Sequence, residues 1–173
     1  MNKLLPLATL LALAGCAGLS SKEIAKGAKF GSPPHYPQTV TLKVDSFTEK
    51  GNFSINANPK LVREAFETIL KRERIFREVS ADGDYVLTAA IRRIDTRGSG
   101  FTAGFNSIID WSLTPRGSSQ KIWQERVTAE GLARLGDALG GNKRYHLAEA
   151  WTYSRNIEAA IQKLQESHVL DKN

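Results

Sequence analysis

Three segments between residues 85 and 129 alternate apolar and polar side chains, and this alternation limits the possible folds more than any other feature of the chain. A period of two residues is typical of a β-strand with one buried face. The apolar faces comprise Tyr85, Leu87, Ala89 and Ile91 in the first segment, Ile109, Trp111 and Leu113 in the second, and Trp123, Val127 and Ala129 in the third. Residues 115–119 contain a proline, a glycine and two serines, which favours a hairpin turn, so the last two strands are predicted to be antiparallel.

Two amphipathic helices are predicted on either side of these strands. The first begins at Asn58 and Pro59, which are favourable residues for an N-cap and a first helical position. Its apolar stripe recurs at three- and four-residue spacing and comprises Leu61, Val62, Ala65, Phe66, Ile69 and Leu70. The second helix is predicted over residues 144–166, and its apolar side comprises Leu147, Ala150, Trp151, Ser154, Ile157, Ala160, Ile161 and Leu164. Each helix therefore has one face to bury.

A further strand over residues 39–47 precedes the first helix, and residues 75–79 fit a short connecting strand. The resulting order predicts an α+β fold: a two-layer sandwich with two helices on one face of a mostly antiparallel sheet of about four strands. The other face of the sheet should be polar, with Asp110 in an ion pair with Arg92 or Arg126. Its expected residues are Thr39, Thr41, Lys43, Asp110, Ser112, Gln124, Arg126 and Thr128.

The N-terminus has the pattern of a signal peptide, in which Lys3 precedes an apolar run that is too short to span a bilayer. The run ends in Leu13-Ala14-Gly15-Cys16, which resembles the lipobox of bacterial lipoproteins. The resemblance implies that the Cys16 thiol receives a diacylglyceryl group, that the chain is cleaved before Cys16, and that the new amino terminus is acylated. It also implies sorting to the outer membrane, because Ala17 rather than aspartate follows the cysteine. Cys16 is the single cysteine, so neither a disulfide nor a cysteine metal site is expected.

The chain is therefore predicted to divide into a signal peptide over residues 1–15, a lipidated cysteine with a flexible tether over residues 16–38, one periplasmic α+β domain over residues 39–167, and a tail over residues 168–173. Prolines at 33, 34 and 37 favour extended backbone in the tether. Residues 20–30 could instead form a short helix, since Ile24 and Ala28 lie near one face of it.

The formal net charge of +6 indicates affinity for anions. Because the chain is expected to be exported, the anions in question are phospholipid head groups, lipopolysaccharide phosphates and peptidoglycan rather than nucleic acid. The candidate basic face comprises Arg72, Arg74, Arg77 and Arg92. Arg93 is expected on the opposite side of its strand from Arg92. The alternative is that these side chains are simply solvated.

Catalytic and metal-binding patterns are sparse. The histidines at 35, 146 and 168 have no metal-ligand spacing, and Ser99 lies between glycines without the strand-turn-helix setting of a nucleophile elbow. The sequence therefore predicts no enzyme, no metal and no cofactor.

The whole arrangement is similar to small outer-membrane lipoproteins of the lipopolysaccharide-assembly and YajG types, and to auxiliary lipoproteins of lipid-transport systems. The similarity rests on the lipobox, the early strand and helix, the three-stranded stretch, and a closing helix with the pair Asn156-Ile157. Two functions are left open. The first is a membrane-anchored, non-enzymatic accessory domain that binds another envelope protein, and the second is a module that binds lipid or glycan.

Overall fold

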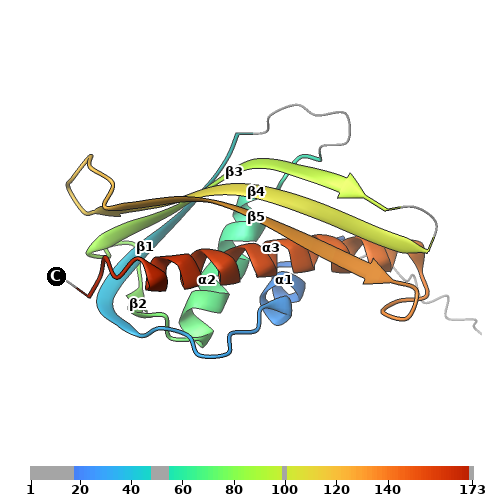
Figure 1. Ribbon diagram of the computed structural model, residues 1–173, viewed down its shortest axis with the longest axis horizontal. Coiled ribbons are helices and arrows are strands. Elements are labelled where there is room, and N and C mark those ends of the chain that lie inside the picture. The colour runs from blue at the N-terminus through green and yellow to red at the C-terminus, as the bar shows by residue number, and fades with distance from the viewer. Residues whose placement is uncertain (1–17, 48–54, 99–100, 172–173) are drawn as a thin grey trace, which may run out of the picture.

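The computed structural model describes residues 18–47, 55–98 and 101–171 (Figure 1). Across these residues the chain forms three helices and five strands. In chain order they are α1 (Ser21–Gly27), β1 (Tyr36–Ser46), α2 (Pro59–Arg72), β2 (Phe76–Val79), β3 (Tyr85–Arg97), β4 (Thr102–Pro115), β5 (Trp123–Arg134) and α3 (Gly141–Glu166). The predicted bounds of α2 and α3 agree with these to within a few residues.

The strands form one sheet in the order β2-β1-β3-β4-β5. β1 pairs in parallel with both β2 and β3, whereas β3, β4 and β5 form an antiparallel meander. The prediction of about four strands in a mostly antiparallel sheet therefore needs correction, because the described sheet has five strands and is mixed. The short segment after α2 is a full member of the sheet, since α2 crosses over the sheet and returns the chain parallel to β1.

All three described helices lie on one face of the sheet, so the two-layer arrangement is confirmed (Figure 1). The paired residues of neighbouring strands show how the faces divide. Leu42, Leu87, Leu113 and Trp123 form one row across β1, β3, β4 and β5, and all four are buried. The ring of Phe66 on α2 stacks on that of Trp111 on β4, with 5.3 Å between the centroids. The core therefore lies between this sheet face and the helices.

The segment expected as a tether carries α1, which belongs to the core. Ser20 is its N-cap and forms a capping box with Glu23, and Ile24 and Ala25 are buried. Residues 168–171, expected as part of a tail, also return to the domain, where Leu170 is buried. The packed structure therefore extends beyond both predicted ends of the domain.

A buried polar cluster joins α3 to the sheet. The side-chain amide of Asn156 accepts a hydrogen bond from the Trp111 indole nitrogen at 2.8 Å and donates to the Ser107 hydroxyl and the Val127 carbonyl, each at 3.0 Å. Thr152 lies one helical turn earlier, and its hydroxyl donates to the Ala129 carbonyl at 2.8 Å. Because buried polar groups need partners, these bonds fix the position of α3 along β5.

α3 lies close to the backbone of β5 at Gly131. A Cβ atom at this glycine would lie 2.0 Å from the Ala148 carbonyl oxygen and 2.5 Å from the Thr152 nitrogen. Any larger residue at 131 would force the helix away from the sheet.

Candidate functional site

The face of the sheet that points away from the helices is polar, as the sequence predicts. The row next to the buried leucines comprises Lys43, Thr88, Ser112 and Gln124, and it faces the opposite way because neighbouring strand residues alternate. Thr41, Asp110, Arg126 and Thr128 lie on the same side by the same alternation. We call this surface the outer sheet face.

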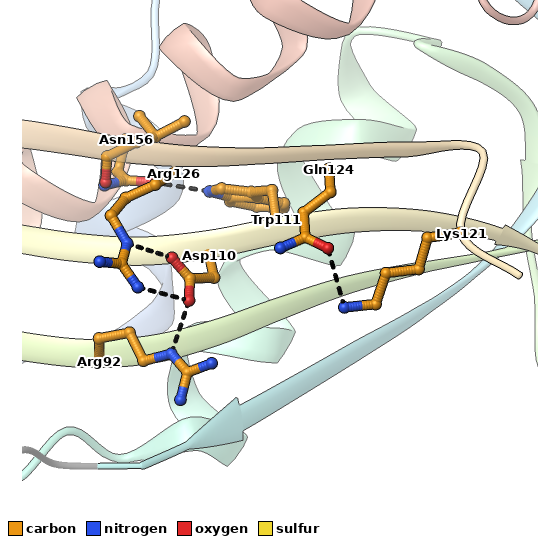
Figure 2. A network of polar contacts seen from close by, with 8 residues as sticks. Arg92, Asp110, Trp111, Lys121, Gln124, Arg126 and Asn156 are labelled. Atoms are coloured by element: carbon orange, nitrogen blue, oxygen red, sulfur yellow. Dashed lines mark hydrogen bonds and ion pairs between the residues drawn. The ribbon is translucent and has the colours of Figure 1, made fainter. Parts of the chain in front are cut away.

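Asp110 lies at the centre of an ion-pair network on the outer sheet face (Figure 2). Its carboxylate accepts hydrogen bonds from Arg126 at 2.6 and 3.0 Å and from Arg92 at 2.7 Å. The hydrogen bond from Arg126, with a smaller contribution from Arg92, holds the pKa of Asp110 below its usual range. Both predicted pairings of Asp110 are therefore present at once, and they cross-link β3, β4 and β5.

A β-bulge places two successive arginines on the outer sheet face. Ile91 pairs with Ile109 and Arg93 with Ile108, so Arg92 is the extra residue on β3. The side chain of Arg93 pairs with Asp95 at 2.7 Å, while Ile94 is buried. The expectation that Arg93 lies on the opposite side of the strand from Arg92 is therefore wrong, because the extra residue shifts the alternation.

The four arginines of the predicted basic face occupy different parts of the molecule. Arg72 ends α2 and donates hydrogen bonds to the Ala25 and Ala28 carbonyls at 2.7 and 3.0 Å, which fastens α1 to the domain. Arg74 and Arg77 line one hollow of about 520 Å³ beside β2. The guanidinium of Arg92 lies on the outer sheet face, where it also stacks over the Phe47 ring at 5.4 Å. The structure therefore brings Arg74 and Arg77 together but not with Arg72 or Arg92. Cys16 lies outside the described residues.

A groove of about 630 Å³ runs between α1 and α3. Its walls carry both signs of charge around the half-buried indole of Trp151. They comprise Glu23, Lys26, Gly27, Lys29, Asp137, Lys143, Leu147, Trp151, Arg155 and Glu158. The backbone nitrogen of Lys29 donates to the Glu158 carboxylate at 2.6 Å, while burial raises the pKa of Glu158. The sequence did not predict this groove, because it exists only where α1 docks on α3.

Within the described ranges, no group of three His, Cys, Asp or Glu side chains is arranged to hold a metal ion. The ring of His35 contacts the Arg74 carbonyl at 2.8 Å, that of His168 contacts Asp171 at 2.8 Å, and His146 lies half-buried on α3. None of the described helices is both long enough and apolar enough to cross a membrane.

No protein-family model matches the sequence, and no curated protein matches it either. Solved structures do match. Protein XCC0632 from Xanthomonas campestris, described under the family model DUF330, is 10% identical, has a TM-score of 0.58, and aligns over 82% of this chain and 93% of its own. The hypothetical protein CT253 from Chlamydia trachomatis is 10% identical with a TM-score of 0.56, over 79% of this chain and 99% of its own.

A minor lipoprotein from Acinetobacter baumannii also matches, at 14% identity over 80% of this chain and 95% of its own, but its TM-score of 0.45 is too low to carry an argument. At such identities, likeness to the first two structures concerns the fold alone. The chain therefore has an α+β fold similar to those of XCC0632 and CT253.

Proposed function

We propose that the protein is a lipoprotein of the bacterial outer membrane, anchored through Cys16 and facing the periplasm, that acts as a non-enzymatic accessory domain for another envelope protein. The lipobox and the short apolar run before it support the anchor. The similarity to accessory lipoproteins described above supports the role.

The observation that carries this proposal is the outer sheet face. Four long strands present it as a broad surface opposite the helix layer. Threonine side chains and arginines are prominent there, and arginine is enriched at protein interfaces. Arg126 keeps 64% of its side chain exposed although Asp110 holds its guanidinium in place. The surface is thus ordered before any partner arrives, which reduces the entropy cost of binding.

A second function, glycan binding, is supported by the groove between α1 and α3. Trp151 lines this groove together with residues that carry carboxylate, ammonium and guanidinium groups. Sites for lipid tails are lined mostly by apolar residues, whereas seven of the ten residues that line this groove are charged. The groove therefore suits a polar ligand such as a peptidoglycan fragment better than an acyl chain.

Site-specific photo-crosslinking in intact cells separates the two functions. A photoreactive residue is placed at Thr128 on the outer sheet face, at Lys26 in the groove, or at Gln162 on the exposed side of α3. The accessory role predicts one discrete protein adduct from Thr128 and none from Gln162. Glycan adducts from Lys26 without any protein adduct from Thr128 would support the second function instead.

A further inference from the structure

One end of the molecule exposes large apolar side chains. Phe101 is 73% exposed, Leu135 is 42% exposed and Leu139 is 87% exposed. Thr102 pairs with Arg134, so Phe101 and Leu135 adjoin each other at the ends of β4 and β5. Leu139 lies in the loop that follows β5 and leads into α3, at the same end of the sheet (Figure 1). We call these three residues the apolar tip.

The loop that carries Leu139 is held in a fixed shape. The buried guanidinium of Arg144 donates to the Ala138 and Leu139 carbonyls at 2.9 and 2.8 Å. The Asp137 carboxylate accepts from the Arg134 nitrogen at 2.7 Å. Leu139 is therefore pushed into solvent by an ordered loop. Exposed apolar side chains gathered at one end of a molecule are suited to contact with an apolar phase or a partner.

The position of α1 indicates where the lipid on Cys16 can reach. Ser154 donates to the Ile24 carbonyl, and Glu158 accepts from the Lys29 nitrogen, so the segment from Ile24 to Lys29, which includes the end of α1, advances in the same direction as α3. Ser154 lies roughly 20 Å along α3 from its start at Gly141, at 1.5 Å per residue. The helix from Ile24 back to Ser20 leads toward the start of α3 and shortens that distance by about 6 Å.

The chain from Ser20 back to Cys16 spans at most about 14 Å when fully extended. This is close to the distance that remains to the tip end of α3. The opposite end of the domain, at the turn between β4 and β5, is farther away. Ser154 is about 18 Å from the end of α3 at Glu166, and the stretch from Ile24 back to Ser20 adds about 6 Å to that distance, which makes about 24 Å. Of the two ends, only the tip end lies within reach of a membrane that holds a lipid on Cys16.

We propose that the apolar tip enters the interface of the phospholipid leaflet that holds the Cys16 lipid, which rests on the lipid anchor in the proposed function. Exposed basic side chains surround the tip, namely Arg97, Arg134 and Lys143, and these favour anionic head groups. The domain then stands on its tip, with the outer sheet face directed along the membrane surface and accessible to a neighbouring protein.

Fluorescence from single labelled positions tests the orientation. The lipidated protein carries Leu139→Cys or, as the control at the other end, Ser118→Cys. In the mature form the Cys16 thiol is blocked by its lipid, so an environment-sensitive thiol dye labels only the new cysteine. Each protein is reconstituted into vesicles of phosphatidylethanolamine and phosphatidylglycerol, with or without brominated acyl chains. The dye at 139 should shift its emission to shorter wavelength and lose intensity with brominated lipid, and the dye at 118 should do neither.

Flotation of the same vesicles separates the failure of this inference from the failure of the anchor. If both proteins float and the dye at 139 keeps its aqueous emission without quenching, the tip does not enter the membrane while the anchor stands. If neither protein floats, the lipid anchor is absent and both proposals are overturned. Because Leu139 is almost fully exposed, its substitution should not affect folding, which circular dichroism checks.

Discussion

The side chain of Asn156 connects the last helix to two strands of the sheet. It is fully buried, and its amide satisfies the Trp111 indole nitrogen on β4 and the Val127 carbonyl on β5. A buried donor or acceptor that loses its partner costs the free energy of its desolvation. The residue thus contributes to the register of α3 as well as to its affinity for the sheet.

We expect Asn156→Ala to lower the free energy of unfolding by about 2–4 kcal/mol, because it leaves both groups without their partner. Urea denaturation followed by tryptophan fluorescence measures the change. Gln162→Ala, at an exposed site on the same helix, is the control and should change stability by less than about 0.5 kcal/mol. A loss of similar size in both variants would show that the cluster has no special role.

Glu149 should make stability depend on pH. Burial raises the pKa of Glu149 from 4.5 to about 7. The pKa of the neighbouring Tyr153 is also raised, chiefly by burial and to a smaller extent by the charge of Glu149. Between pH 4.5 and about pH 7, the Glu149 carboxyl of the folded protein holds a proton that the unfolded chain has released. The contribution to stability is therefore complete below about pH 4.5 and is lost as the pH rises through about 7.

Glu149→Gln should remove this dependence, since glutamine stays neutral throughout. Melting temperatures of the wild type and the variant at about pH 5 and about pH 8 test it, because that interval spans the titration. The wild type should lose more stability over that interval than the variant does. Parallel pH profiles for the two proteins would assign the effect to other groups.

At the scale of the elements, α1 is held in place by the two other described helices rather than by the sheet. Arg72 of α2 donates hydrogen bonds to the carbonyls of Ala25 and Ala28, in the last turn and at the C-cap of α1. The hydroxyl of Ser154 on α3 donates to the Ile24 carbonyl. A helix of seven residues is too short to be stable in isolation, so these contacts and the burial of Ile24 hold it.

Arg72→Ala should loosen α1 without unfolding the domain, at a cost of about 1–2 kcal/mol to the docking of that helix. Hydrogen exchange should become faster for residues 21–28 and remain unchanged in β3, β4 and β5. Lys71→Ala, an exposed neighbour on α2, serves as the control. Exchange that accelerates equally in the sheet would contradict a local role for Arg72.

The bulge on β3 predicts that one deletion is tolerated where another is not. Removing Arg92 leaves Ile91 and Arg93 on consecutive partners, Ile109 and Ile108, so the apolar alternation survives. This deletion should give a folded protein that lacks one arm of the Asp110 network. Removing Thr88 should prevent folding, because it turns buried residues of the same strand outward; near-ultraviolet circular dichroism compares the two.

The sequence predicts those elements in which apolar residues recur with the period of a helix or a strand. The stripes of α2 and α3 and the alternation of β4 and β5 are of this kind. The burial of α2, β4 and β5 confirms their predicted faces, while the buried side of α3 also takes in Thr152, Tyr153 and Asn156, which the predicted stripe did not include. Strand direction has no such local signal, so the parallel pairing of β1 could not be inferred. A bulge cannot be predicted in this way either, because the extra residue interrupts the two-residue alternation of the strand. The docking of α1 depends on contacts across more than 120 positions, such as that of Ile24 with Ser154.

At the scale of the whole molecule, the anchor and the fold should be separable. Cys16→Ala should leave the protein unlipidated and absent from the outer membrane, while the domain still folds, because Cys16 precedes the packed residues. Fractionation of cell envelopes and circular dichroism of the purified variant measure the two properties. Gly18→Ala is the matched control, since an added Cβ there has no neighbour within 4 Å. A Cys16→Ala protein that stays with the outer membrane would refute the lipobox.

The contact between α1 and α3 also has a consequence for the order of folding. It joins the beginning of the domain to its last helix, so the packing of α1, which also contacts α2, stays incomplete until nearly the whole chain has emerged from the ribosome or translocon. The chain around α1 therefore stays only partly covered while the protein emerges, and α3 is the last element to pack on it. Enzymes that modify the N-terminus would meet it as an open peptide, and completion of the fold would then close the domain over its own first helix.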